Sequence, residues 1–284
     1  MSPERKAPTR RLGDYYRSGD WSDYWKTSIS YVGRNVIRVR GYNTQDITRN
    51  LSYHELLFLT IKGELPTKAQ ARVFDAVLCS FPDHQFISSQ SAASRYVASA
   101  HSESPIPGIA AGVLCVGMHT ISPQDAAEVI EQAWEMKERE KLTLRQTAKR
   151  VADHYIKNKL YIPGVGHPTH KDFDPRGDTL AEIAKENGVY GEKSRLYEMI
   201  HEEFVKKTGR TLPINVDGRV ACVLTEMEFD PMEMAGVGLT GVLPGIIAHV
   251  IEEIRDGVPL RVVPEALGSK YIGPPERAIP KKRK

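Results

Sequence analysis

The sequence predicts an all-α protein with a single small β region. Apolar residues recur at helical spacing over most of the 284-residue chain. Serine or threonine, followed by proline or by an acidic or amide residue, precedes several of these segments, as is typical of a helix start. Alternation of apolar and polar residues, which indicates a strand, is confined to residues 28–39.

The N-terminal part carries the strand signal and two helices. Residues 28–39 contain a glycine within the alternating pattern and predict a small hairpin. Residues 51–62 predict a helix because Ser52 and Glu55 form a capping-box pair ahead of an apolar run. Residues 67–79 predict a second helix, which begins with a threonine that follows a proline.

Helices dominate the rest of the chain. Ser122 precedes Pro123, a residue favoured at the first helical position, and this helix is expected to run to about Lys141. Further helices are predicted at residues 143–157, 177–187, 193–208, 216–228, 231–243 and 244–256. No internal repeat or long linker divides the chain.

The net charge of +3 is unevenly distributed. Residues 1–17 carry +3 and residues 276–284 carry +4, which leaves about −4 on the body of the chain. A mildly acidic body argues against a nucleic-acid-binding surface. The terminal Lys-Lys-Arg-Lys run favours a solvated tail over an electrostatic hook or a localisation signal.

Cysteine usage and hydropathy predict the compartment. Cys79, Cys115 and Cys222 fit no metal-ligand spacing and have apolar neighbours, so we expect reduced core residues. We find no apolar run long enough to cross a membrane, and the N-terminus lacks the apolar stretch of a signal peptide. We therefore expect a cytoplasmic protein that binds neither a membrane nor nucleic acid.

Two segments about forty residues apart carry the side chains of a proton-transfer site. His167 lies in a glycine-loosened turn, and Arg176 follows a proline nine residues later. Asp217 stands beside a glycine, where a backbone can approach a ligand closely. A histidine, an arginine and a carboxylate supply a proton donor, a carboxylate clamp and a base, and can make or break a carbon–carbon bond beside a thioester. The alternative is structural, since Asn215 or Asp217 could be the N-cap of the following helix.

The segment from Gly164 to Arg176, GVGHPTHKDFDPR, resembles the glycine–histidine and Asp-Pro-Arg segment of the citrate synthase superfamily. PINVDG, which contains Asp217, resembles its catalytic-aspartate segment. Residues 40–66 resemble its early segment, and LPGIIAH, residues 243–249, resembles its late large-domain helix. The four motifs occur in family order over roughly residues 26–265. The chain is closest in kind to citryl-CoA lyase and to the citryl-CoA-cleaving part of ATP-citrate lyase.

The resemblance implies a large helical domain that is interrupted by a smaller one. The small domain is expected at residues 122–222, and the large domain at residues 26–121 and 223–265. The remaining residues form a flexible N-terminal tail, 1–25, and a basic C-terminal tail, 266–284. The resemblance also implies a homodimer or a higher multiple, and coenzyme A bound as a thioester substrate together with a 2-oxo acid. No metal is predicted, because no cluster of ligand residues in the sequence requires one.

Carried onto this sequence, the resemblance implies catalytic roles for His167, Asp217 and His84. In cleavage, Asp217 protonates the carbon beside the thioester, and His167 is the base that takes the proton of the tertiary hydroxyl. Arg176 binds a substrate carboxylate with its planar fork, while His84 contacts substrate oxygens. Arg261 resembles an arginine that reaches the neighbouring subunit's site. Coenzyme A contacts are implied for Lys171, Pro163, Gly164, Val165 and Gly166.

Two positions depart from the family pattern. Its enolate-binding His-Gly pair falls on Thr120 and Ile121, with His119, a candidate substrate ligand, one residue early. The citryl-CoA-cleaving branch also lacks this histidine. Val242 falls where the family usually has a second carboxylate-binding arginine. The substrate is therefore expected to carry one carboxylate fewer than citrate, or to bind it differently.

We expect a citryl-CoA lyase-like enzyme that cleaves a 3-hydroxy-3-carboxyacyl-CoA to acetyl-CoA and a 2-oxo acid. The chain length agrees, because it is short of the N-terminal helices of full-size citrate synthases. One alternative is Claisen condensation by a citrate synthase or 2-methylcitrate synthase. The other is an inactive coenzyme A-binding subunit, which the missing arginine favours and the intact set of His167, Arg176 and Asp217 disfavours.

Overall fold

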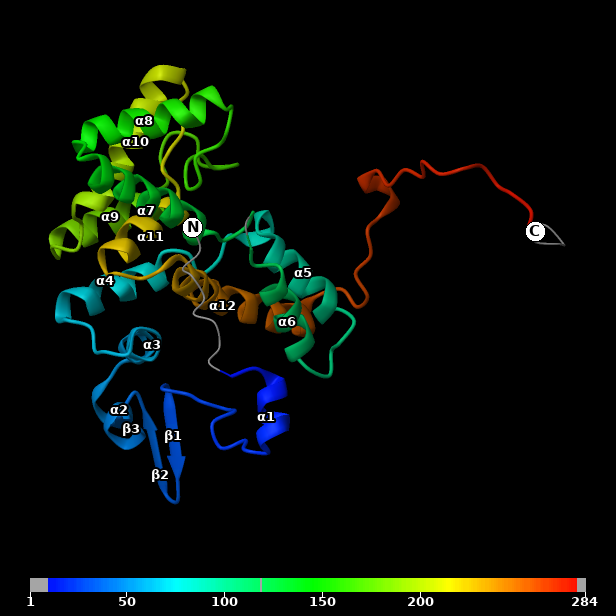
Figure 1. Ribbon diagram of the computed structural model, residues 1–284. Helices are drawn as coiled ribbons and strands as arrows, with labels where there is room; N and C mark the ends of the chain where they lie inside the picture. Colours follow the sequence, from blue (N-terminus) through cyan, green and yellow to red (C-terminus); the bar gives the residue numbers. More distant parts are fainter. Residues whose placement is uncertain (1–9, 118, 280–284) are drawn as a thin grey trace. The chain divides into compact units, whose positions relative to one another are not determined.

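The protein is mostly helical, as predicted, and its sheet has three short strands (Figure 1). The computed structural model describes residues 10–117 and 119–279, so the charged ends of both predicted tails lie outside the described residues. The chain divides into an N-terminal unit, residues 1–74, and a C-terminal unit, residues 75–284. The domain boundaries expected at residues 122 and 222 stay predictions.

The N-terminal unit contains the predicted hairpin. Strand β1 (Ser30–Gly33) pairs antiparallel with β2 (Val36–Val39), and the short β3 (Tyr42–Asn43) continues the sheet. Helices α2 (Thr44–Asn50) and α3 (Tyr53–Lys62) follow. The predicted capping pair is present at the start of α3, where Glu55 accepts a hydrogen bond from the Ser52 backbone N–H at 2.8 Å.

Helix α1 (Leu12–Ser18) lies within the segment that was predicted to be a flexible tail. It brings Tyr15, which is 8% exposed, into an aromatic group with Trp21 and Tyr24 at ring-centroid distances of 5.6 and 5.0 Å. A helix of seven residues spans less than two turns, too short for a periodic sequence signal. The ordering comes from these aromatic contacts.

Helix α4 (Lys68–Cys79) crosses from the N-terminal unit into the C-terminal unit. The other elements of the C-terminal unit are η1 (Gln85–Ile87), α5 (Ser89–Ala98), α6 (Ile106–Leu114), α7 (Pro123–Glu140), α8 (Leu144–Lys157), α9 (Pro175–Glu186), α10 (Glu192–Thr208), α11 (Val216–Glu226), α12 (Pro231–Asp256) and η2 (Glu265–Leu267). The predicted helices from residue 122 to 228 are thus confirmed within two residues at each end.

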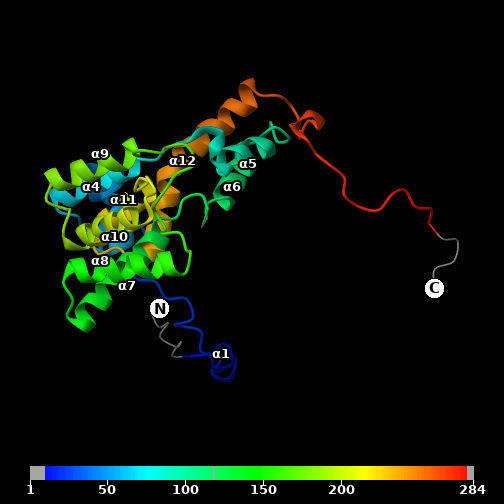
Figure 2. The same cartoon turned by 90° about the horizontal axis from the view of Figure 1, so that it is seen from above.

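Two groups of helices form the C-terminal unit. Helices α8 and α10 pack together, and α11 packs against α7, α9 and α10. Helix α12 contacts α7 and also α5 and α6, which lie alongside its C-terminal half (Figure 2). The core of the C-terminal unit includes large side chains that are less than 2% exposed: Ile130, Leu180, Leu196, Tyr197, Ile200, Leu224, Met234 and Ile246.

The prediction of two helices at residues 231–243 and 244–256 is wrong, because α12 is continuous through Pro244. Proline inside a helix costs about 3 kcal/mol. Packing outweighs this cost. Phe81 and the Pro82 carbonyl lie so close to Gly241 and Gly245, on either side of Pro244, that a Cβ at either glycine would collide with them. The continuous helix has the length and mean hydropathy (1.8 over 18 residues) that could cross a membrane, contrary to our expectation. Its contacts with α5, α6 and α7 place it within this fold.

The cysteines only partly follow the expectation of core residues. All three are free thiols, but Cys79 is exposed and Cys115 is half-buried. Only Cys222, in the apolar helix α11, is a core residue.

Candidate active site

A cavity of about 560 Å³ lies in the C-terminal unit, where the loops before α5, α7, α9 and α11 meet. Most of the predicted site residues line it: His84, His119, Pro163, Gly164, Gly166, His167, Arg176 and Asp217. Val165, Lys171 and Arg261 are not among its lining residues. Four stretches far apart in sequence therefore supply one site.

The turn before His167 is held against the start of α11. Gly164 has φ +82°, and a Cβ there would lie 2.5 Å from the Tyr197 hydroxyl and 2.6 Å from Gly218 Cα. Only glycine allows this approach. The Asn215 backbone N–H donates to the Gly164 carbonyl, and its side-chain amide donates to the Gly166 carbonyl at 2.8 Å. These contacts fix His167 beside the segment that carries Asp217.

Asn215 is the N-cap of α11, because its Oδ1 accepts the Gly218 N–H at 3.1 Å. Asp217 is therefore free of the capping role. Its carboxyl lies half-buried in the cavity wall, and burial raises its pKa to about 6, although the Ser122 backbone acts to lower it. A carboxyl with this pKa can both give and accept a proton near neutral pH.

Arg176 is positioned by the fully buried carboxylate of Asp174. Its Nε and Nη2 donate to the two oxygens of Asp174 at 2.9 and 2.7 Å. Asp174 also caps α9 and accepts the Val216 N–H at 3.0 Å, so one carboxylate joins the starts of α9 and α11. Burial alone would raise the pKa of Asp174, but the hydrogen bonds and charge of Arg176 bring it below its usual value. The Nη1 group of Arg176 remains available to a ligand.

The hydrogen bonds of His167 determine its tautomer. Its Nδ1 accepts the backbone N–H groups of Thr169 and His170, each at 3.0 Å. Burial, followed by the charge of Arg176, lowers the pKa of His167 to about 4, so the ring is neutral at pH 7. A neutral imidazole whose Nδ1 accepts must carry its proton on Nε2. His167 is therefore a hydrogen-bond donor to the cavity.

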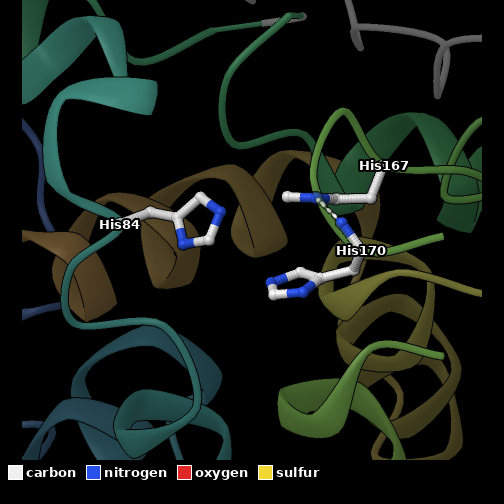
Figure 3. A group of neighbouring side chains, drawn as sticks. All are labelled: His84, His167 and His170. Atoms are coloured by element: carbon white, nitrogen blue, oxygen red, sulfur yellow. Dashed lines mark hydrogen bonds between the residues drawn. The ribbon is translucent and has the colours of Figure 1, made fainter.

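His84 and His170 complete a group of three imidazoles (Figure 3). His84 faces His167 and His170 across the site, with ring centroids 5.0 and 5.4 Å away. His170 is half-buried and stacks on His167, with the ring centroids 4.5 Å apart. Their ligand nitrogens lie within 4.8 Å of one another, which the sequence did not indicate. Because Nδ1 of His167 is occupied and Nε2 is protonated, the group suits a substrate oxygen better than a metal ion.

A side pocket of about 10 Å³ adjoins the cavity, and the two share His84, Ser88, Ile121 and Arg176. The rest of its wall consists of Phe81, Pro82, Asp83, Gln90, Ser91, Val242 and Ile246. Nε2 of His84 and the side-chain oxygen Oε1 of Gln90 are buried and have no hydrogen-bond partner among the described residues. An unpartnered buried polar group costs about 1–3 kcal/mol. Such groups are candidates for ligand contacts.

Helix α12 holds the segment that carries His84. The missing side chains of Gly241 and Gly245 admit Phe81 and the Pro82 carbonyl. One turn further along α12, His249 Nε2 hydrogen-bonds to Asp83 Oδ1 at 3.0 Å, while its Nδ1 accepts Arg95 Nε at 3.1 Å. Helix α12, which contains the LPGIIAH motif, thus positions His84 through its contacts with the preceding residues 81–83.

The remaining predicted residues have other contacts. Arg261 binds Glu253 of the same chain through Nε and Nη2, at 2.6 and 2.9 Å. Lys171 is exposed and donates to the His167 carbonyl at 3.1 Å. His119 is exposed at the cavity, and Thr120 uses its hydroxyl within its own turn, on the carbonyls of Cys115 and Gly117.

Asp174 and Gln90 were not assigned a role from the sequence. Asp174 precedes a proline at the first position of a helix, which signals an N-cap but not its ion pair with Arg176. Gln90 lies on α5 without any local signal, and only the tertiary structure shows that its side-chain oxygen is buried without a hydrogen-bond partner among the described residues.

The family model for the C-terminal domain of citrate synthase matches residues 67–262. The chain belongs to this family. Its fold matches that of citryl-CoA lyase from Hydrogenobacter thermophilus with a TM-score of 0.81 and 35% sequence identity, over 90% of this chain and 98% of that one. The expected citrate-synthase-like fold is thereby confirmed.

Two other relatives are more distant. Citrate synthase 2 of Bacillus subtilis is 25% identical over 232 residues, which are 79% of this chain and 59% of that protein. ATP citrate lyase from Methanothrix soehngenii, solved with citrate and coenzyme A, has a TM-score of 0.77 at 21% identity and shares the fold. The match covers 97% of this chain and 46% of the lyase chain. The chain thus spans about three fifths of the curated relative and about half of the larger lyase.

Proposed function

We propose that the protein is a citryl-CoA lyase-like enzyme that cleaves a 3-hydroxy-3-carboxyacyl-CoA to acetyl-CoA and a 2-oxo acid. The observation that carries this proposal is the meeting of Asp217, His167 and Arg176 in one cavity, with the pKa of Asp217 raised to about 6. The similarity to citryl-CoA lyase supports it.

Binding would use the free donors of the site. Nη1 of Arg176 binds the carboxylate on the tertiary carbon, while Asp174 keeps the guanidinium in place. Nε2–H of His167 donates to the hydroxyl oxygen, whose negative charge increases as the reaction proceeds. Coenzyme A would lie along Pro163, Gly164 and Gly166, with Lys171 beside them.

Cleavage needs one proton removed and one returned. Because His167 carries its proton on Nε2, it cannot accept the hydroxyl proton, and we assign that step to the unpartnered Nε2 of the facing His84. The carbon–carbon bond then breaks, and its electron pair forms the enolate of acetyl-CoA. The protonated carboxyl of Asp217 gives its proton to this enolate, so acetyl-CoA and a 2-oxo acid leave.

Claisen condensation is the second candidate, because the curated relative is a citrate synthase and the same groups serve the reverse bond formation. Condensation requires a donor for the enolate oxygen. Cleavage passes through the same enolate, so the use of the Thr120 hydroxyl within its own turn does not separate the two directions. The similarity to citryl-CoA lyase favours cleavage. An inactive coenzyme A-binding subunit is disfavoured by the assembled site.

The test is incubation with citryl-CoA and, separately, with acetyl-CoA plus oxaloacetate. We expect acetyl-CoA and oxaloacetate from the first mixture, with little free thiol from the second. Rapid release of coenzyme A and accumulation of free citrate in the second mixture would identify a synthase. Binding of coenzyme A without turnover in either mixture would identify an inactive subunit.

A further inference from the structure

Arg219 lies two residues after Asp217 on α11, but it is not among the residues that line the cavity or its side pocket. Two residues of an α-helix turn by about 200°, so Arg219 lies on the opposite side of α11. Its side chain is 13% exposed. Nη1 donates to the Tyr190 hydroxyl at 2.7 Å and to Glu198 Oε1 at 2.6 Å, and Nη2 donates to Asp178 Oδ1 at 3.2 Å. One guanidinium therefore joins α11 to α9, to α10 and to the loop between them.

Helix α9 has the same spacing of a site residue and an ion-pair residue. Arg176 lines the cavity, and Asp178, two residues later, pairs with Arg219. Between them, Gly177 lies so close to α11 that a Cβ would be 2.8 Å from Arg219 Cγ and 3.3 Å from the Asn215 carbonyl oxygen. The substrate-facing side chains and the ion pair thus lie on two sides of one contact between α9 and α11.

Two polar contacts join the first turns of these helices. Asp174 accepts the Val216 N–H at 3.0 Å beside the cavity. One helix turn further along, Asp178 meets Arg219. One contact alone leaves the angle between two helices free to change, and a second contact one turn away fixes it. The second contact therefore determines how the guanidinium on α9 is placed relative to the carboxyl on α11.

Stability alone does not account for a charged side chain at this place. Moving an arginine and its partners out of water costs about as much free energy as the ion pairs return, so apolar side chains of similar size are often as stable. Nε of Arg219 is also buried without a hydrogen-bond partner among the described residues, which adds to the cost. The arginine gives a fixed geometry between three helices.

We infer that Arg219 is a positioning residue, which acts through its pair with Asp178. The pair sets the placement of Arg176 relative to Asp217, and hence of the bound carboxylate relative to the acid that protonates the enolate. This inference rests on the proposed function.

Asp178→Ala is the main test, because its carboxyl is 40% exposed and the variant should fold. We expect kcat for citryl-CoA to fall about tenfold or more, since a displacement of about 1 Å between reacting groups is sufficient for such a loss. KM should stay within about threefold of the wild-type value, because Arg176 remains paired with Asp174. Asp178→Glu keeps a carboxylate within reach of Arg219 and should recover most of the lost kcat.

Two matched variants control for the loss of a charge and of an ion pair. Glu182→Ala removes an exposed carboxylate one turn further along α9. Lys193→Ala removes an ion pair between α10 and α7, in which Lys193 Nζ donates to Glu131 at 2.8 Å. Both variants should keep the wild-type kcat, with folding checked by circular dichroism at the assay temperature.

Arg219→Lys tests the other partner of the pair. Lysine keeps the charge but cannot bond Asp178 and Glu198 together through a planar fork. A folded Arg219→Lys protein should show the kcat loss of Asp178→Ala, and the double variant should lose no more than either, because both changes remove one contact. Losses in kcat that multiply in the double variant would contradict the pair.

The outcomes separate the inference from the proposed function, since kcat is compared in whichever direction the wild-type protein turns over. A wild-type kcat in Asp178→Ala, or an equal loss in Lys193→Ala, would overturn the inference and leave the lyase proposal standing. Absence of turnover by the wild-type protein in either direction would overturn the lyase proposal, and the inference with it.

Discussion

Single residues in this site have roles that depend on their neighbours. Asp217 can act as an acid because Asn215 caps α11 in its place. His167 donates because two backbone N–H groups occupy its Nδ1. The identity of both residues was predictable from their motifs. The separate roles of His167 as a hydrogen-bond donor and His84 as the base were not predictable, because they depend on hydrogen bonds that only the folded loop makes.

Asp217→Asn should reduce cleavage at least about a thousandfold, because the amide cannot donate a proton to the enolate as the carboxyl does. Coenzyme A binding and the fold should be retained, as isothermal titration and circular dichroism would show. Turnover within a few-fold of wild type would make Asp217 a structural residue.

The same variant should change the pH dependence of stability. The pKa of Asp217 is raised on folding, from 3.8 to about 6, so its stabilising protonated form is lost as pH rises through 6. Asp217→Asn should therefore be the more stable protein above pH 6, by up to about 3 kcal/mol, and equal to wild type near pH 3. Urea denaturation at several pH values would measure this difference, and equal stabilities at pH 8 would contradict it.

Arg176→Lys should raise KM for the acyl-CoA substrate roughly tenfold or more while binding of free coenzyme A changes little. Lysine keeps the positive charge but lacks the planar guanidinium, which pairs with both oxygens of Asp174 and still has an N–H group for the substrate. Arg150→Lys, at a largely exposed position paired with Glu140, is the control. Equal losses for both ligands would place Arg176 at the coenzyme.

At the scale of elements, local signals were sufficient for most helices. Pairs such as Ser52 with Glu55 mark a helix start through a few neighbouring residues, so the sequence alone contains the information. Helix α12 shows the limit. Its continuity through Pro244 depends on Phe81 and Pro82, more than 150 residues away, which pack against its glycines.

Gly164→Ala tests how the turn holds His167. The new methyl group would meet Tyr197 Oη and Gly218 Cα at 2.5 and 2.6 Å, on a residue with φ +82°. We expect a loss of about 2–4 kcal/mol in stability and a large loss of activity. Gly188→Ala is the matched control, since Gly188 has φ +70° but no atom within 4 Å of the added Cβ. It should lose about 1 kcal/mol and keep its activity. Equal effects of both changes on activity would contradict the role of this contact.

At the scale of the whole molecule, the family and the helical class were predictable because four motifs occur in order along the chain. The side pocket was not, because residues from α5, α12 and the intervening loops meet there only in the fold. The compartment and the assembly remain expectations of the sequence.

We predict a homodimer. Helices α5 and α6 expose Tyr96, Ile106 and Leu114, with Leu114 85% exposed, and a second copy would cover such residues. Sedimentation equilibrium of the intact chain should give twice the mass of 31.8 kDa. An active monomer would contradict this prediction and the cross-subunit role of Arg261.

The measurement that tests the central proposal most directly is cleavage of citryl-CoA in D₂O, followed by mass spectrometry of the products. Cleavage with Asp217 as the acid predicts acetyl-CoA that carries one deuterium in its methyl group, together with one equivalent of 2-oxo acid, and no such product from Asp217→Asn. Release of free coenzyme A and an intact hydroxy acid, or an equal yield of labelled acetyl-CoA from Asp217→Asn, would contradict it.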